Sequence, residues 1–240
     1  MKQKHIFVFF ISLLASIHLG YTQTEVEKTV PATKDTTQTS TTKYYGLRIG
    51  ADISKPIRSL LSPEYSGFEI VGDFRIKKNY YLAAEVGNET RTSVLTNINS
   101  TSQGSYVKAG VNYNVYENWV GMNNLIYVGG RAGFSSFSEE LNSYTIRTTN
   151  ALFGDDTRTE SREFDGLNST WLELLFGLQT EVLSNLYLGI QAQLKYSITR
   201  TEPDGFTNIF IPGFGETTDG SQFGVGYGYT ISYLIPFVKK

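Results

Sequence analysis

Apolar and polar residues alternate with a period of two along most of this chain, and this pattern constrains its fold more than any other feature. From Tyr44 to Ser54, the apolar residues Leu47, Ile49 and Ala51 are separated by small or polar ones. Because successive side chains of a β-strand point to opposite faces, the alternation predicts a strand with one apolar and one polar face. Seven later segments repeat it, with apolar members running from Phe68 to Ile76, Leu82 to Val86, Val107 to Val115, Ile126 to Phe134, Leu172 to Val182, Leu188 to Ile198 and Phe223 to Ile235.

The connections between these expected strands fall into two length classes. The shorter class comprises Lys77–Asn79, Tyr116–Asn124 and Ser184–Asn185, and the longer class comprises Lys55–Ser66, Thr90–Gln103, Glu139–Asn168 and Arg200–Gly220. Strands of about ten residues are long enough to cross a bilayer when tilted, and outer-membrane barrels have short periplasmic turns and long outer loops. We therefore predict an all-β fold, namely an eight-stranded antiparallel up-and-down transmembrane β-barrel.

The polar face of the expected strands decides between a membrane barrel and a soluble one. A soluble barrel hides its apolar face inside, whereas a membrane barrel turns that face to lipid. Here the polar face is rich in charged residues, and aromatic residues gather near strand ends, where rings at a lipid–water interface belong. The last expected strand also carries aromatic residues on one face, at Tyr227, Tyr229 and Tyr233. We predict the cell outer membrane as the location, and a soluble periplasmic β-barrel binding protein is the alternative.

The N-terminal region has the composition of a targeting segment followed by a linker. Lys2 and Lys4 precede an apolar run, Ile6–Ile17, which is typical of a secretory signal peptide and too short for a transmembrane helix. We predict a signal peptide over residues 1–22. Residues 23–43 are rich in Thr and charged residues and bury too little apolar area to fold, so we predict a disordered periplasmic tether there. The barrel is then expected over residues 44–238.

The residue types of the chain restrict its chemistry. There is no Cys, and both histidines, His5 and His18, lie in the expected signal peptide. A Ser–His–Asp triad, a thiolate nucleophile and a zinc site of His or Cys ligands are therefore excluded for the mature protein. The acidic pairs Glu139-Glu140 and Asp155-Asp156 are interpreted as solvated surface. The net charge of −2 gives no general basis for binding nucleic acid. We predict a protein that is not an enzyme and has no metal and no cofactor.

Two groups of side chains are candidate functional residues. An eight-stranded barrel has room inside for little more than side chains, and buried charges must pair. We predict interior ion pairs among Arg48, Glu69, Asp73, Arg75, Glu85, Lys108, Arg131, Glu173 and Lys195. The second group is an apolar loop segment, which would either contact a partner or fold over the barrel mouth. Its members are Phe206, Ile209, Phe210, Ile211 and Phe214.

Three segments carry a resemblance to a known group of proteins. Tyr45–Arg58, with the sequence YGLRIGADISKPIR, is the most distinctive, and Gly67–Arg75 and Leu82–Glu89 extend it. Over about residues 44–238, the chain resembles an uncharacterised family of small outer-membrane β-barrels of the Bacteroidetes type. More loosely, it is similar to barrel components of the Bacteroidetes secretion machinery and to OmpA-type barrels. The resemblance implies fold and location, and it implies no activity.

The function that these observations predict lies in the surfaces of the barrel. We expect a non-enzymatic structural or interaction component of the cell envelope, surrounded by outer-membrane lipids. Its protein partner in the envelope would be contacted through the loops or the tether. A small pore and a lipid- or transport-related barrel are the alternatives from another class, and a membrane enzyme is the least favoured.

Overall fold

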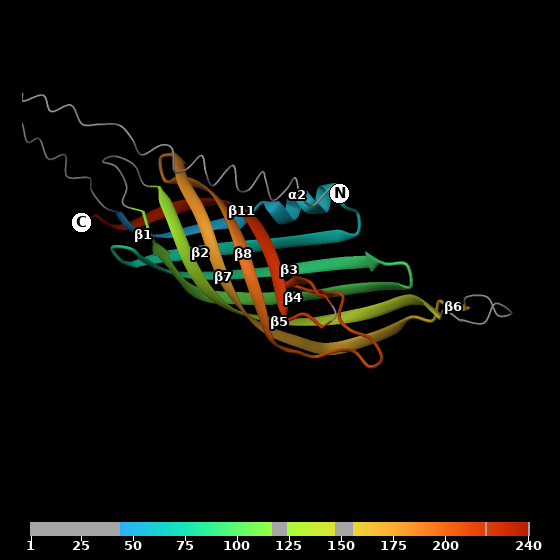
Figure 1. The fold of residues 1–240 in the computed structure, drawn as a ribbon. Helices are drawn as coiled ribbons and strands as arrows, with labels where there is room; N and C mark the ends of the chain where they lie inside the picture. The colour runs from blue at the N-terminus through green and yellow to red at the C-terminus, as the bar shows by residue number, and fades with distance from the viewer. Residues whose placement is uncertain (1–43, 117–123, 147–155, 219, 240) are drawn as a thin grey trace, which may run out of the picture. The chain divides into compact units, whose positions relative to one another are not determined.

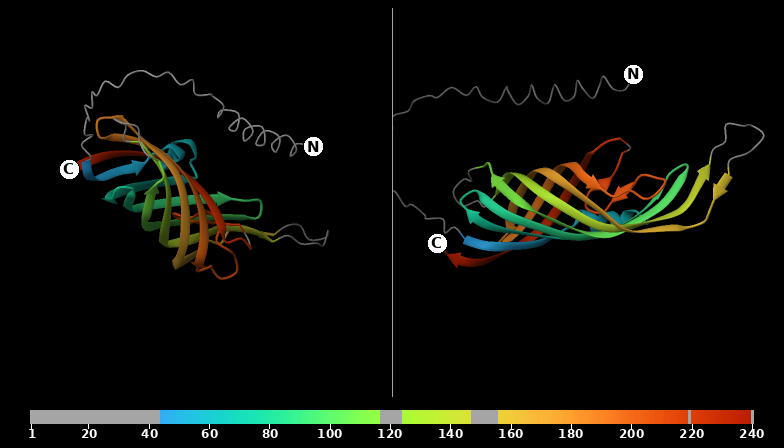
Figure 2. Two further views of the ribbon diagram at one scale, coloured as in Figure 1. Left: turned by 60° about the vertical axis from the view of Figure 1, so that its left-hand side comes forward. Right: turned by 90° about the horizontal axis from the view of Figure 1, so that it is seen from below.

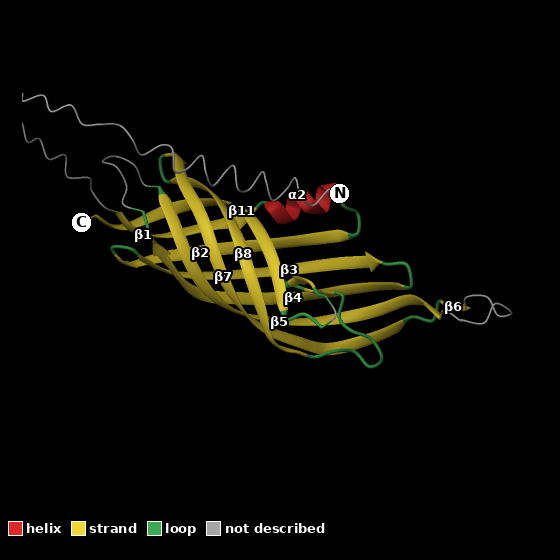
Figure 3. Ribbon diagram, viewed as in Figure 1, coloured by secondary structure: helices red, strands yellow, loops and turns green. Residues whose placement is uncertain are grey.

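The computed structural model describes residues 44–116, 124–146, 156–218 and 220–239. The expected signal peptide and tether, and Asp155, lie outside these residues. The strands and helices of the described part are β1 (Tyr44–Asp52), α2 (Ser54–Leu61), β2 (Tyr65–Lys77), β3 (Tyr80–Val94), β4 (Ile98–Asn114), β5 (Leu125–Ile146), β6 (Asp156–Arg158), β7 (Arg162–Leu183), β8 (Leu186–Arg200), β9 (Phe210–Ile211), β10 (Gly215–Glu216) and β11 (Phe223–Lys239). Figures 1 and 3 show their arrangement.

Eight of the described strands form a closed ring. The hydrogen-bonded order runs β4-β3-β2-β1-β11-β8-β7-β5, and an additional pairing of β4 with β5 closes the circle. All of these pairings are antiparallel, and the first and last strands of the ring, β1 and β11, are neighbours. The expected all-β, eight-stranded antiparallel barrel is therefore confirmed. Closure satisfies the backbone donors and acceptors that an open sheet would leave at its two edges.

The side chains of the ring are distributed inside out relative to a soluble barrel. Along β7, Leu172, Leu174 and Phe176 are exposed, while the alternating Trp171, Glu173 and Leu175 are buried. The other strands follow the same rule, so that most exposed large side chains are apolar. The buried polar residues include Arg48, Asp52, Glu69, Glu85, Glu89, Lys108, Arg131, Glu173, Gln191, Gln193 and Lys195. We call the band of exposed apolar side chains around the ring the apolar belt.

Several strands continue well beyond the apolar belt, where loops were expected from the sequence. β3 and β4 are joined only by residues 95–97, and β5 and β7 each have 22 residues. The expected long loops Thr90–Gln103 and Glu139–Asn168 are thus largely wrong. Figure 2 shows the green and yellow strands extending past the rest of the barrel. We call this extension of β3, β4, β5 and β7 the protruding sheet.

The composition of the protruding sheet explains why it was missed. Ser93 and Ser102 are buried on its inner face, while Thr92 and Thr101 pair through their hydroxyl groups at 3.0 Å. With polar residues on both faces, the period-two contrast in hydrophobicity disappears, although the backbone ladder continues. The period-two pattern of the sequence therefore detects only the part of each strand that lies within the apolar belt.

The expected loop Lys55–Ser66 also contains a secondary-structure element, the short helix α2. Its basic and apolar residues lie on different faces: Lys55 and Arg58 are partly covered, whereas Ile57, Leu60 and Leu61 are exposed. Ser59 connects the helix to β2, because its hydroxyl group accepts a hydrogen bond from the Gly67 amide at 3.0 Å. Among the described residues, no helix has the length and hydropathy of a membrane span.

Candidate functional site in the barrel interior

The part of the interior near the start of β1 and the end of β11, which we call the lower part, contains an ion pair between β1 and β2. Arg48 on β1 and Asp73 on β2 are opposite each other in the ladder, and their side chains meet at 2.6 Å. The guanidinium carbon of Arg48 also lies 4.9 Å from the centre of the Tyr81 ring and 5.3 Å from that of Tyr187. The Asp73 carboxylate and the two tyrosine rings together stabilise the Arg48 guanidinium, which is buried away from water.

The next layer of the interior leaves little free space. Arg131 on β5 contacts Glu85 on β3 at 3.3 Å, and Tyr127 donates a hydrogen bond to Gln191 at 3.0 Å. The remaining cavity here has a volume of about 30 Å³. That is room for about two or three water molecules, so side chains fill most of this layer.

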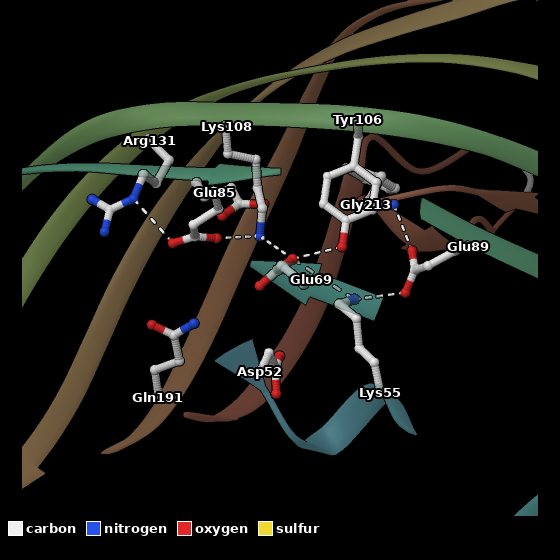
Figure 4. A network of polar contacts seen from close by, with 12 residues as sticks. Asp52, Lys55, Glu69, Glu85, Glu89, Tyr106, Lys108, Arg131, Gln191 and Gly213 are labelled. Atoms are coloured by element: carbon white, nitrogen blue, oxygen red, sulfur yellow. Dashed lines mark hydrogen bonds and ion pairs between the residues drawn. The ribbon is translucent and has the colours of Figure 1, made fainter. Parts of the chain in front are cut away.

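Above this layer, Lys108 is the centre of a buried charge network, shown in Figure 4. Its ammonium group lies 3.1 Å from Glu69 and also pairs with Glu85. Tyr106, two residues away on the same face of β4, donates a hydrogen bond to Glu69 at 2.6 Å. The network links β2, β3, β4 and, through Arg131, β5, so the charges connect four neighbouring strands across the interior.

A second part of this network brings α2 and a distant loop to the same place. Lys55 of α2 lies 2.6 Å from Glu89 of β3 and 3.8 Å from Glu69. Glu89 accepts two further hydrogen bonds, from the Tyr65 hydroxyl at 2.5 Å and from the Gly213 backbone amide at 2.6 Å. One carboxylate therefore holds the helix, strand β2 and the loop together. Figure 4 shows its contacts with Lys55 and Gly213.

The loop that contains Gly213 folds into the mouth of the barrel. Ile211 and Phe214 are buried with Tyr106, Phe137, Leu167 and Trp171 in one apolar cluster. Lys195 of β8 donates hydrogen bonds to the backbone carbonyls of Gly213 at 2.8 Å and Phe214 at 3.0 Å. We call residues 206–217 the mouth loop. It is fixed both by apolar packing and by hydrogen bonds, and it covers part of the barrel mouth.

Beside the mouth loop, a larger cavity of about 470 Å³ lies between α2, β11 and the charge network. Its charged lining residues are Asp52, Lys55, Arg58, Glu69, Glu89, Lys108, Lys195 and Glu216. Its other side is formed by the β11 segment 223–227. A volume in the range of about 300 to 1,000 Å³ is typical of small-molecule sites. We call this space the mouth cavity.

Most of the interior residues predicted from the sequence lie in these contacts, and one does not. Lys195 and Glu173 approach to 3.8 Å, and Glu173 also accepts a hydrogen bond from Trp171 at 2.7 Å. Arg75 lies instead at the turn end of β2, where it donates a hydrogen bond to the Lys78 carbonyl and approaches the Tyr81 ring. Strand register explains this difference, because Arg75 is near the end of the strand, below the interior layers.

Four residues of the network are absent from the predicted ion pairs: Lys55, Tyr65, Glu89 and Tyr106. Lys55 was assigned to a loop, and a loop lysine carries no signal that it points inward. Glu89 shares a strand face with Glu85, which is the signal that would have included it. Its partners could not have been deduced, because they come from α2 and from the mouth loop more than a hundred residues later.

The apolar loop residues lie in the mouth of the barrel and do not form an exposed patch. Phe210, Ile211 and Phe214 are almost completely buried, and Phe206 and Ile209 are partly buried. In the structure this segment covers the barrel mouth, which is one of the two roles expected for it. Its apolar side chains are stabilised more by packing on Tyr106 and Trp171 than by contact with water. A protein partner cannot reach these three side chains while the loop is in place.

The described residues contain no group of three or more acidic, His or Cys side chains placed to hold a metal ion. Fold and site together define the class of this protein: a closed eight-stranded antiparallel β-barrel with a charged, largely filled interior, an apolar outer belt and a loop-covered mouth.

The chain belongs to the family described as Domain of unknown function (DUF6048), whose model matches residues 5–240. No curated protein matches the chain. Among solved structures, it is similar to Ail, the attachment invasion locus protein of Yersinia pestis, with 12% sequence identity and a TM-score of 0.35. The match covers 79% of this chain and 95% of that one. A likeness this weak adds nothing to what the strand topology establishes.

Proposed function

We propose that this protein is an outer-membrane β-barrel that acts as a non-enzymatic structural or interaction component of the cell envelope. The distribution of apolar side chains is the observation that carries the proposal. On three neighbouring strands, the paired residues Leu174, Leu194 and Val225 all point outward and are exposed. An apolar belt around a charged interior is costly in water and favourable in lipid.

The ends of the barrel support an orientation. The chain enters at β1 and leaves at β11 on the side of the tight turns β2–β3 and β7–β8, opposite the protruding sheet. Outer-membrane barrels have their short turns in the periplasm. In this orientation residues 23–43 lie in the periplasm as a tether, and the protruding sheet is the surface offered to an envelope partner. The Bacteroidetes-type origin remains a prediction of the sequence resemblance.

The pore alternative is less well supported than the structural one. The interior ion pairs connect the neighbouring strands β2 to β5 through the interior, and the free space in the lower layer is about 30 Å³. A transport path would have to break several buried ion pairs, each expensive to separate. The protein incorporated in planar bilayers should therefore give negligible conductance.

Fractionation tests the location, and affinity purification tests the role. The full chain should be recovered with outer membranes, should need detergent for extraction, and should migrate differently on gels before and after boiling. Recovery in the soluble periplasm would refute the membrane assignment and favour a soluble binding barrel. Purification in mild detergent of the native chain and of a chain lacking residues 24–43 should give a partner that depends on the tether or on the protruding sheet. The absence of any specific partner from both would refute the interaction role.

A further inference from the structure

The wall of the barrel is interrupted at one place, beside the mouth cavity. The ladder between β1 and β11 ends at Asp52 and Thr230, followed by one more hydrogen bond from the Ile53 amide to the Tyr229 carbonyl at 2.7 Å. The ladder between β1 and β2 ends at Ala51. Beyond these points, β11 pairs with β8 and β2 pairs with β3, and within the described residues no strand joins β11 to β2.

The helix α2 occupies this interruption and repeats the inside-out pattern of the strands. Lys55 and Arg58 turn to the mouth cavity and line it. Ile57, Leu60 and Leu61 face away, and the last two are 87% and 79% exposed. A helix cannot hydrogen-bond to the strands on either side as a ninth strand would, so it covers the gap without sealing it.

The mouth cavity extends through this gap to the outer surface of β11. Gly224 and Gly226 line it on the inward face, where they lie against the Phe214 ring and against the ends of Gln193 and Lys195. Outward-facing Val225 also lines it and is 80% exposed, whereas Leu194, its ladder partner on β8, is 48% exposed. The difference arises because β11 has a strand neighbour on only one side here. Apolar groups on both sides of the gap would therefore meet lipid chains.

One cation at the rim of the gap, Arg58, has only a weak and exposed partner. Two guanidinium groups share the carboxylate of Glu216, with Arg91 at 3.0 Å and Arg58 at 3.9 Å. Glu216 is 66% exposed, so its contact with Arg58 is weak and replaceable. The deeper cations Lys55 and Lys108 are already paired with buried acids. Arg58 lies over the Tyr65 ring at 4.2 Å, and of the cavity's cations it has the weakest ion pair for a ligand to replace. Guanidinium groups bind phosphate in two-point geometry.

We propose that this lateral opening binds one phosphorylated lipid of the surrounding membrane. Its phosphate would lie at Arg58, and one acyl chain would lie along the outer face of β11 at Phe223, Val225 and Tyr227, beside Leu61. The inference rests on the proposed function, because the chain reaches the gap only if the belt lies in a membrane. The mouth cavity has room for a head group and leaves the acyl chains in the bilayer.

The test uses the full chain, purified folded in a neutral maltoside detergent, and titrates it with palmitoyl lysophosphatidic acid. Binding is measured by calorimetry, and retained lipid is counted by native mass spectrometry. We expect one site. Monopalmitoyl glycerol, which has the chain without the phosphate, should bind at least tenfold more weakly, and inorganic phosphate should not compete at millimolar concentration.

Two variants address the two halves of the site. Arg58→Gln should weaken lysophosphatidic acid about tenfold and leave the glyceride unchanged. Gly226→Leu should abolish binding of both, because its side chain would enter the cavity near the flexible ends of Gln193 and Lys195. The matched controls are Gly130→Leu, which adds the same side chain to the open outer face of β5, and Arg158→Gln in an exposed ion pair of the protruding sheet.

Each result decides the inference. Equal binding by wild type, Arg58→Gln and Gly226→Leu would mean lipid held non-specifically around the belt, and would overturn it. The inference would also be overturned if the wild-type protein bound no lipid while its heat-modifiable migration showed that it was folded. That second result would leave the proposed membrane barrel standing, whereas a protein that is soluble without detergent would refute the proposed function itself.

Discussion

Replacing Lys108 by methionine tests whether the interior charges hold the barrel wall together. Lys108 is 2% exposed and contacts Glu69 at 3.1 Å and Glu85 as well. Removing one partner of a buried ion pair costs about 3–5 kcal/mol, because the other charge is left without compensation. Here Glu69 keeps the Tyr106 hydroxyl and Glu85 keeps Arg131. We therefore expect a loss near the lower limit, about 3 kcal/mol, or roughly a hundredfold in the unfolding equilibrium.

The measurement is reversible urea unfolding of the barrel in lipid vesicles, followed by fluorescence and by heat-modifiable migration. Lys108→Met combined with Glu69→Gln should recover part of the loss, because one of the two uncompensated carboxylates is then neutral. Arg158→Gln is the control, since it removes an ion pair that is half-exposed and should change the free energy by no more than about 0.5 kcal/mol. If Lys108→Met changes the free energy of unfolding as little as this control, the reasoning about the interior network is wrong.

Three further predictions concern the mouth loop, the protruding sheet and the apolar belt. Gly213 has φ +81°, and a Cβ there would lie 2.5 Å from the Tyr106 ring, so Gly213→Ala should lower the free energy of unfolding by about 2 kcal/mol or more. Gly205→Ala, at φ +95° in open space, should lower it only by the cost of the strained backbone. Equal losses of the two variants in urea unfolding would contradict this prediction. Burial raises the pKa of Glu139, which lies above the belt, to about 7, although Ser100 and the Ile209 backbone oppose the shift. The folded state then binds the proton more tightly than the unfolded state, so the free energy of unfolding should fall by up to about 3 kcal/mol as pH rises from about 4.5 to about 7. Glu139→Gln should remove this dependence. Parallel pH profiles of stability for the wild type and Glu139→Gln would argue against the prediction. Leu174→Arg on the outer face should destabilise the barrel in vesicles by about 2–4 kcal/mol, while no loss would place that face outside the hydrocarbon core.

The sequence predicts the belt portions of the strands well, because there each face has one character. On β7, the alternation of Leu172, Leu174 and Phe176 with Glu173 gives both the strand and its orientation. The same signal fails for the protruding sheet, because both of its faces are polar there: Thr92 lies on one face and Ser93 on the other. It also fails for α2, whose eight residues are too few to establish a helical period.

The interior network was predictable only in part, and strand register is the reason. Period-two alternation selects residues that point inward, such as Glu69, Glu85 and Lys108, but it does not give their height in the barrel. Arg75 points inward by sequence count and yet lies at the turn end, beside Lys78. Glu89 meets Lys55 and Gly213, which come from a helix and a loop, and no local pattern specifies such contacts.

The sequence by itself determined that this chain forms alternating strands with a charged face, and that residues 23–240 contain neither His nor Cys. These are properties of residue type and period, which do not depend on how distant segments meet. Only the tertiary structure decided that the charged residues connect neighbouring strands across a filled interior, that the mouth loop covers that interior, and that α2 leaves a lateral opening beside β11. Each of these features depends on register and ring closure, because both bring together residues that are far apart along the chain.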